Sequence, residues 1–216
     1  AVDSAFLKTD GIEQAQAREL FGLPRDGSII GVPGTLRPTK GHAFLFKAIE
    51  QLVDQIPGVT FALTGDTKAD YAADVLATAA TSSVRDQIVF LGNVVNMPAF
   101  YAACDLVCIP SKSESFGRTV IESFASGCPV IATAVGGMRE TVRNGVNGQL
   151  VAYGDVTGLM EAIIDLLTDS EKGHAYAEAA RIDAAELYGE DICGERILSI
   201  AESAVDNALN MQKGYE

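Results

Sequence analysis

The sequence predicts an α/β domain in which a Rossmann-like, six-stranded parallel sheet carries helices on both faces and is followed by a helical tail. Three observations predict it. Short runs rich in Val and Ile are mostly apolar throughout, as is typical of strands buried on both faces. Longer segments between them place apolar residues at helical spacing. The two kinds of segment alternate six times along the chain, which favours parallel strands joined by helices.

Six segments carry the strand pattern. The first, SIIGVPG, contains Ile29, Ile30 and Val32, so that apolar side chains fall on both faces of the expected strand. The six expected strands are Ser28–Gly34, Val59–Gly65, Gln87–Leu91, Asp105–Ile109, Pro129–Ala132 and Gly148–Val151.

The segments between the strands have the pattern of amphipathic helices. In Gly41–Ile56, residues such as Leu45, Ile49 and Leu52 recur at helical spacing and form one apolar face. Further helices are expected at Ala69–Thr81, Met97–Cys104, Gly117–Ser126 and Met138–Arg143, and the tail at Val156–Leu167, Glu171–Leu187 and Asp191–Asn210. Because six strands account for one sheet, residues 1–216 are expected to form a single domain, with tail helices over about 156–210.

Composition and charge exclude several classes of protein. The 216 residues are 48% hydrophobic and 21% charged, which is ordinary for a globular chain and excludes a disordered, collagen-like or disulfide-scaffold protein. The 16 basic and 29 acidic residues give a formal net charge of −13. Such a surface repels phosphate backbones, so nucleic acid and anionic membrane are not expected partners.

Neither a membrane span nor a metal site is predicted. The longest uncharged apolar stretch, Ser123 to Met138, is too short for a span and is interrupted by Gly and Pro. Two histidines and four cysteines without metal-ligand spacing give no metal site. Because Cys104, Cys108 and Cys128 lie in apolar runs, they are expected to be buried free thiols of a cytoplasmic protein.

The first candidate binding loop follows the first strand. In an open parallel sheet, ligands bind past the carboxyl ends of the strands. The loop GTLRPTKGH begins at Gly34, carries Arg37 and Lys40, and opens a helix. Two cations beside the amide groups of a helix start suit a diphosphate. The alternative is that both cations are simply solvated.

The second candidate loop follows the fourth strand. It carries Glu114, and Gly117 lies where a helix is expected to start, so that free amides there can hold a phosphate. Glu122, eight residues after Glu114, can accept two hydroxyl groups, as a ribose offers. The alternatives are that Glu114 only caps the helix and that Glu122 is an exposed helical carboxylate.

Two further turns lie at the same edge. Gly92 and Val94, after the third strand, offer backbone groups that can pair with a flat heterocycle. The adjacent Gly136 and Gly137, after the fifth strand, indicate either tight packing or the close approach of a ligand.

At this point the motifs resemble a known family. ESFGRTVIE, from Glu114 to Glu122, resembles the E-x7-E motif of retaining glycosyltransferases of the GT-B fold, family 4. GTLRPTKGH resembles the phosphate loop of that family, and Phe90–Gly92 resembles its base-binding turn. GCPVIATAVGGMRETVRNGVNGQLV is similar to the segment that follows E-x7-E, and VDSAFLK is similar to the entry into the second domain. The resemblance covers about residues 2 to 205.

The resemblance implies the donor half of a two-domain glycosyltransferase. That half binds a nucleotide-diphosphate sugar, a UDP- or GDP-sugar by expectation, and no further cofactor is firmly implied. An acceptor-binding N-terminal domain is absent from this chain. The chain alone is therefore expected to be inactive in sugar transfer, which would serve polysaccharide, lipid-linked or other glycoconjugate synthesis. A peripheral place at the membrane, through the missing domain, is compatible with this role.

The resemblance also assigns roles to residues. Glu122 would hold the ribose hydroxyls, Glu114 would face the donor sugar, and Lys40 and Arg37 would neutralise the diphosphate leaving group. Lys40, Arg37 and Glu114 are thus the expected catalytic groups. The remaining expected contacts to the nucleotide sugar are Gly34, Gly92, Val94, Phe116, Gly117, Arg118 and Thr119.

One departure and two alternatives stand beside this interpretation. The family often has Gly-Arg five or six residues before the Lys, whereas position 35 is Thr35 and Arg37 lies three residues before Lys40. Arg37 would then substitute from a shifted position. The alternative functions are another GT-B activity that binds nucleotide sugars, such as an epimerase or a phosphorylase, and a non-catalytic interaction domain. The opening AVDSAFLKTD has no leader pattern and no initiator Met, so we expect a processed or excised piece.

Overall fold

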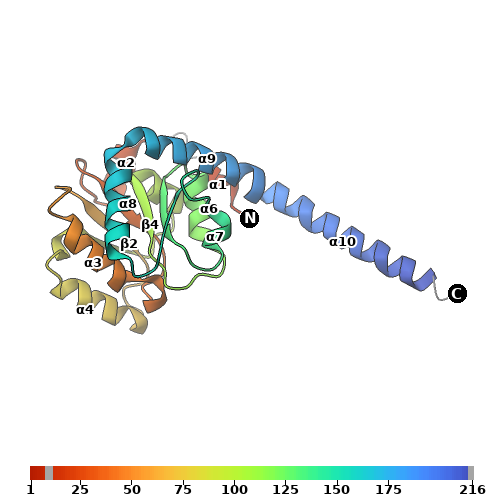
Figure 1. Cartoon of the computed structure of the whole chain (residues 1–216), viewed down its shortest axis with the longest axis horizontal. Coiled ribbons are helices and arrows are strands. Elements are labelled where there is room, and N and C mark those ends of the chain that lie inside the picture. The colour runs from red at the N-terminus through yellow and green to blue at the C-terminus, as the bar shows by residue number, and fades with distance from the viewer. Residues whose placement is uncertain (8–11, 214–216) are drawn as a thin grey trace.

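In the computed structural model, a six-stranded, wholly parallel sheet lies at the centre of the folded domain (Figure 1). The structure describes residues 1–7 and 12–213, with side chains as far as Ala204. Lys8, the last residue of the opening segment VDSAFLK, lies outside the described residues, as do residues 214–216.

The strands follow one another in the spatial order β3-β2-β1-β4-β5-β6. Each lies within two residues of its expected bounds, so the predicted sheet is confirmed. The chain builds outward from β1 in one direction and then from β4 in the other, and ligands of such sheets bind where this reversal separates the loops. The strands are β1 Ile29–Val32, β2 Thr60–Thr64, β3 Ile88–Gly92, β4 Leu106–Ile109, β5 Val130–Thr133 and β6 Gln149–Val151.

Helices connect the strands and form the tail, as expected. The helices are α1 Ser4–Leu7, α2 Gln14–Leu20, α3 His42–Leu52, α4 Ala73–Thr81, α5 Met97–Ala103, α6 Arg118–Ala125, α7 Met138–Thr141, α8 Val156–Thr168, α9 Ser170–Tyr188 and α10 Glu190–Lys213. Short 3₁₀ turns lie at Pro38–Lys40 (η1), Asp70–Ala72 (η2) and Arg85–Gln87 (η3).

The helices α1 and α2 were not expected from the sequence. The segment of α2 is mostly polar and has no clear apolar face. It is held instead through Arg18, which is buried although charged. Its guanidinium donates to the Ala103 carbonyl (3.2 Å) and pairs with Asp105 (2.7 Å), just before β4. A buried, paired arginine thus anchors α2 together with the buried Ala17.

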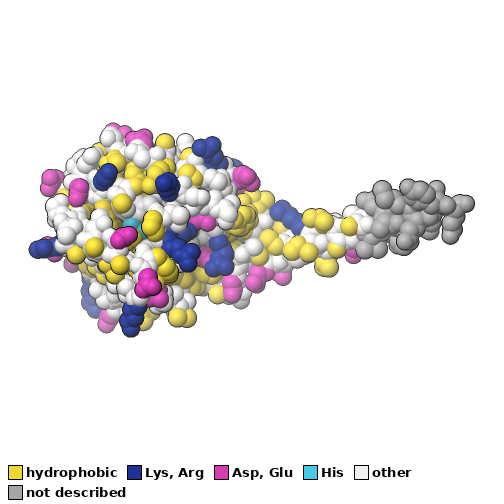
Figure 2. Space-filling model, turned by 90° about the horizontal axis from the view of Figure 1, so that it is seen from below, with side chains coloured by type: hydrophobic (Ala, Val, Ile, Leu, Met, Phe, Trp, Pro, Cys, Tyr) yellow, Lys and Arg dark blue, Asp and Glu magenta, His cyan; other side chains and the backbone are white. Residues whose placement is uncertain are grey.

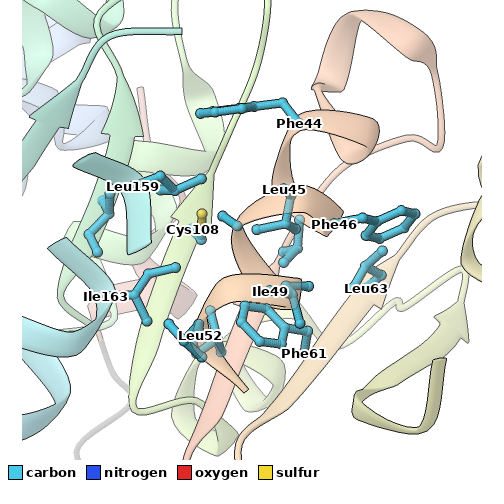
Figure 3. Close-up of a cluster of buried hydrophobic side chains, with 14 of the residues drawn as sticks. Phe44, Leu45, Phe46, Ile49, Leu52, Phe61, Leu63, Cys108, Leu159 and Ile163 are labelled. Carbon is cyan, nitrogen blue, oxygen red and sulfur yellow. The ribbon is translucent and has the colours of Figure 1, made fainter. Parts of the chain in front are cut away.

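Two apolar cores cover the two faces of the sheet. In β1, Ile30 and Val32 point to one face and Ile29 to the other, as the alternation of side chains along a strand requires. The first core is filled by α3, α4 and α8; Figure 3 shows Leu45 of α3 and Leu159 of α8 beside the strand residues. The second core is filled by α2, α5, α6 and α9.

Three cysteines lie in these cores, as expected. Cys104, Cys108 and Cys128 are buried and free. Burial raises the pKa of Cys108 and of Cys128 to about 12, so both thiols stay protonated at neutral pH.

The last helix, α10, projects away from the body of the molecule (Figure 1). It begins after Gly189, whose extended backbone separates it from α9. Apolar side chains lie along its described part (Figure 2), including Ile197, Leu198 and Ile200, which are 64–70% exposed. Among the helices that the structure describes, none combines the length and apolarity needed to cross a membrane.

Candidate functional site

The loops after β1, β4 and β5 are packed against one another at the carboxyl edge of the sheet. Gly41 has a positive φ of 75°, and a Cβ atom there would overlap the Pro110 carbonyl oxygen. A Cβ atom at Gly136 would likewise overlap the Glu114 carbonyl oxygen. The Lys112 amide donates to the Thr39 carbonyl oxygen at 2.8 Å. The glycines of these loops therefore serve close packing of backbone on backbone.

This packing brings Lys40 and Glu114 together. The Lys40 ammonium forms an ion pair with Glu114 Oε2, and the two side chains are only 24% and 16% exposed. Gly34 lies beside the same lysine, because a Cβ atom there would be 3.6 Å from Lys40 Cε. The Gly34 amide donates to Thr64 Oγ1 at 3.0 Å. Three predicted site residues thus share one corner at the reversal between β1 and β4.

Arg37 contacts an aromatic ring of a neighbouring loop. Its exposed guanidinium stacks on the ring of Tyr71, with 4.7 Å between the guanidinium carbon and the ring centroid. Tyr71 belongs to η2, which follows β2. We had not expected Tyr71 in this region, because an aromatic residue in a polar turn gave no signal of a partner.

Glu122 is not the exposed helical carboxylate of the alternative reading. Its side chain is only 13% exposed. Oε2 accepts a hydrogen bond from the Tyr101 hydroxyl at 3.0 Å, and Oε1 lies 3.2 Å from Arg118 Nε. The contact of Tyr101 with Glu122 was not predicted from the sequence, because Tyr101 lies in the apolar run of α5.

The helix α6 begins at Arg118, four residues after Glu114. Gly117 precedes the helix with a positive φ of 79°, and Arg118 and Thr119 form its first turn. The first amide groups of a helix have no partner within it and are directed toward an incoming anion. The ring of Phe116 is half exposed and meets Tyr188 edge-on, with centroids 6.3 Å apart.

Gly92 and Val94 lie at the other end of the row of loops. Gly92 ends the edge strand β3 with a positive φ of 68°, and its carbonyl accepts from the Gly65 amide at 2.8 Å. Val94 is half-buried and packs against the second core. Their loop leads into α5, so that α5 connects this turn to Glu122 through Tyr101.

His42 is the first residue of α3, directly after the loop that carries Arg37 and Lys40. Its Nδ1 is buried without a hydrogen-bond partner. Burial lowers the pKa of His42 to about 4; the charge of Lys40 lowers it further, and a hydrogen bond with the Arg37 backbone opposes the shift. The imidazole is therefore neutral at physiological pH.

Neither of two hollows on the molecule is lined by Lys40 or Glu114. One, of about 190 Å³, lies between α3 and α4 beside His42 and Asp74. A larger one, of about 530 Å³, lies at the opposite, amino edge of the sheet, beside Ser28 and Pro129. We place the candidate site at the carboxyl edge even though the larger hollow is elsewhere, because the paired polar groups lie there. Among residues 1–7 and 12–213, no group of three or more His, Cys, Asp or Glu could hold a metal ion.

Comparison with known sequences matches this chain to one family. The pattern of the family described as "Glycosyl transferases group 1" matches residues 13–183. The chain is 32% identical over 200 residues to D-inositol 3-phosphate glycosyltransferase of Salinispora arenicola, covering 83% of this chain and 45% of that protein. It is 31% identical over 192 residues to 2-deoxystreptamine glucosyltransferase of Streptomyces kanamyceticus, covering 88% and 49%. The chain thus spans about half the length of these relatives.

Solved structures share the fold. HepE from Anabaena in complex with UDP-glucose superposes with a TM-score of 0.85 and 29% identity, over 94% of this chain and 56% of that one. The C-terminal domain of LpcC, a group 1 family protein from Francisella tularensis, superposes with a TM-score of 0.73 and 25% identity, over 88% of this chain and 100% of that domain. The expectation of a GT-B C-terminal domain fold is confirmed by this match.

Proposed function

The chain belongs to the glycosyl transferases group 1 family, and on that premise we propose that it is the donor-binding part of a retaining glycosyltransferase. The enzyme would move a sugar from a nucleotide-diphosphate sugar to an acceptor in polysaccharide, lipid-linked or other glycoconjugate synthesis. The observation that carries the proposal is the Lys40–Glu114 pair at the reversal of strand order. The amide groups at the start of α6 and the Glu122 carboxylate follow Glu114 within eight residues of the sequence.

Each group at this edge has a role in the proposal. Lys40, with Arg37 at the rim, meets the diphosphate, while Glu122 accepts hydrogen bonds from the ribose hydroxyls. Glu114 faces the donor sugar, and Gly34 leaves room for the diphosphate. The amides of Phe116, Gly117, Arg118 and Thr119 meet the sugar and the distal phosphate, and Gly92 and Val94 frame the base.

The chemistry follows from the charge that develops in the transition state. Breaking the bond between the sugar and the diphosphate leaves an electron-deficient sugar and a diphosphate anion. Preorganised cations and amide groups stabilise that anion without reorganising during the reaction. Lys40, Arg37 and the start of α6 supply these groups. The acceptor hydroxyl attacks the face from which the diphosphate departs and gives its proton to that diphosphate, so the configuration of the sugar is retained.

A uridine donor is the favoured substrate class. Crystal structures of the similar HepE contain UDP and UDP-glucose, and that likeness extends over most of this chain. A guanosine donor is the alternative, which direct titration distinguishes.

The acceptor side would come from a further part of the enzyme, because the chain spans about half the length of its relatives. We propose that this part packs on the exposed apolar residues of α10, including Ile197 and Ile200. Without it an acceptor cannot be oriented, and orientation accounts for much of the rate of a two-substrate reaction. The chain alone would therefore bind donor without transferring sugar. Its buried free thiols favour a cytoplasmic setting.

The test combines binding and transfer. Calorimetric titration with UDP, GDP, ADP and UDP-glucose should show binding of one base in preference to the others. A transfer assay with a labelled donor and a broad acceptor panel should show no product with this chain. Absence of binding to every nucleotide would refute the donor role and favour an interaction domain, and rapid multiple turnovers would refute the need for a further part.

A further inference from the structure

Tyr101 carries a buried hydroxyl that reaches from α5 to α6. The residue is 1% exposed, and its ring packs against Phe100 and Phe6, with centroids 5.6 Å and 6.1 Å away. The hydroxyl lies 3.0 Å from Glu122 Oε2 and 3.4 Å from the Thr119 carbonyl oxygen.

The single proton of this hydroxyl is directed to Glu122. Of the two acceptors, the carboxylate oxygen is the nearer, and a hydrogen bond to a charged acceptor is the stronger. Burial, together with the negative charge of Glu122, raises the pKa of Tyr101 well above its usual range. Tyr101 therefore keeps its proton and acts as a permanent donor to the carboxylate.

Glu122 is held differently at its two oxygens. On Oε1 it meets Arg118, whose side chain is 79% exposed and therefore loosely constrained. On Oε2 it meets Tyr101, whose ring is fixed in the core. Because a carboxylate has about four acceptor positions, these contacts leave positions free for two ligand hydroxyls. The orientation of the free positions is set mainly by Tyr101.

We infer that Tyr101 is a positioning residue, which holds the Glu122 carboxylate in the orientation that receives a vicinal diol such as that of ribose. This inference rests on the proposed function. It also connects two parts of the candidate site, since α5 begins directly after the Gly92–Val94 turn and is capped by Asn96, whose Oδ1 accepts from the Ala99 amide at 3.2 Å. The base-side turn and the carboxylate are thus joined through one rigid helix.

The test is a double-mutant cycle on the whole chain with two ligands, UDP and 2′-deoxy-UDP. Tyr101→Phe keeps the ring and removes the hydroxyl, so UDP affinity should fall about 3- to 10-fold. Tyr101→Phe should lower the affinity for 2′-deoxy-UDP by a clearly smaller factor than the affinity for UDP. The deoxy ligand lacks one of the two ribose hydroxyls that would donate to the Glu122 carboxylate. In a Glu122→Gln background, Tyr101→Phe should change UDP affinity by less than about 2-fold, because the two residues act as a unit.

A matched control separates positioning from stability. Tyr176→Phe removes the hydroxyl of another buried tyrosine, on α9, and should leave UDP affinity unchanged. Two results would show that the Tyr101 hydroxyl has a structural role only. One is that Tyr101→Phe lowers the affinities for UDP and 2′-deoxy-UDP by the same factor. The other is that Tyr101→Phe lowers UDP affinity further in the Glu122→Gln background. Glu122→Gln tells the failures apart: if it weakens UDP binding and Tyr101→Phe does not, this inference alone fails. If Glu122→Gln has no effect on UDP binding, the ribose role of Glu122 fails as well.

Discussion

Lys40 and Glu114, which lie 74 residues apart in the sequence, form an ion pair where the loops after β1 and β4 meet. The pair joins the cation proposed to meet a diphosphate to the carboxylate proposed to face the donor sugar. The Glu114 carboxylate occupies the position from which the lysine would attract an anion. A diphosphate must therefore share this lysine with Glu114 or displace it.

Glu114→Gln is expected to strengthen the binding of UDP. Removing the charge frees Lys40 while keeping the size of the side chain, and a partly exposed ion pair contributes about 0.5–1 kcal/mol. UDP affinity should thus rise about 2- to 5-fold at low salt, with a smaller change for UMP. Isothermal titration calorimetry measures both. Weaker binding of UDP would mean that Glu114 orients Lys40 instead of competing for it.

Lys40→Ala is expected to weaken the binding of UDP more than that of UMP. The ammonium is proposed to meet the second phosphate, and charge-assisted hydrogen bonds contribute about 1.5–3 kcal/mol. The difference should shrink as salt is raised, since ions screen the attraction. Lys47→Ala, which changes an exposed lysine of α3, is the control. Equal losses for the two nucleotides would place Lys40 away from the second phosphate.

His42 is expected to make folding stability depend on pH. Its pKa is about 4 in the folded chain and 6.5 as a free side chain. Above pH 6.5 the His42 imidazole is neutral in both the folded and the unfolded chain. As the pH falls from 6.5 toward 4, the imidazole takes up a proton only in the unfolded chain. Stability is therefore lost in this window, by about 2 kcal/mol at pH 5.

Urea unfolding at pH 7.5 and pH 5 tests this dependence. Between the two pH values, the free energy of unfolding of His42→Gln should fall by about 2 kcal/mol less than that of the native chain. The control His174→Gln, at an exposed position of α9, should show the same fall as the native chain. An unchanged dependence in His42→Gln would show that the imidazole is not protected from protonation.

Gly41→Ala is expected to destabilise the chain and to disturb the site. The added Cβ atom would overlap the Pro110 carbonyl oxygen, and the residue has a φ of 75°. Gly22→Ala is a matched control, because Gly22 has a φ of 63° with nothing within 4 Å of the added atom. Backbone strain should lower the free energy of unfolding of the control by about 1–2 kcal/mol. Overpacking should lower the free energy of unfolding of Gly41→Ala by about 1–3 kcal/mol more. Equal losses in urea unfolding would mean that the two loops separate freely.

The sheet could be predicted from the sequence because each strand depends on local composition. Runs such as Ile29–Val32 are apolar on both faces, and no distant residue is needed to recognise them. The position of Lys40 and Glu114 at one edge followed from the same argument, since all carboxyl ends of parallel strands lie together.

The contacts that orient the site could not be predicted in this way. Tyr101 lies in an apolar helical run, and only the packing of α5 against α6 directs its hydroxyl to Glu122. Arg37 carries the right charge, yet the turn after β2 places Tyr71 beneath it. The helix α2 depends on the ion pair of Arg18 with Asp105, which no helical pattern records.

Titration of UDP into the native chain and into a Lys40→Ala/Glu122→Gln double variant tests the central claim most directly. The account predicts one UDP bound per native chain and a loss of affinity of at least about 30-fold in the double variant. A Lys47→Ala/Glu161→Gln variant, changed at exposed helical positions, should bind like the native chain. Unchanged affinity in the double variant, or no UDP bound by the native chain, would contradict the assignment of this edge as a nucleotide-sugar site.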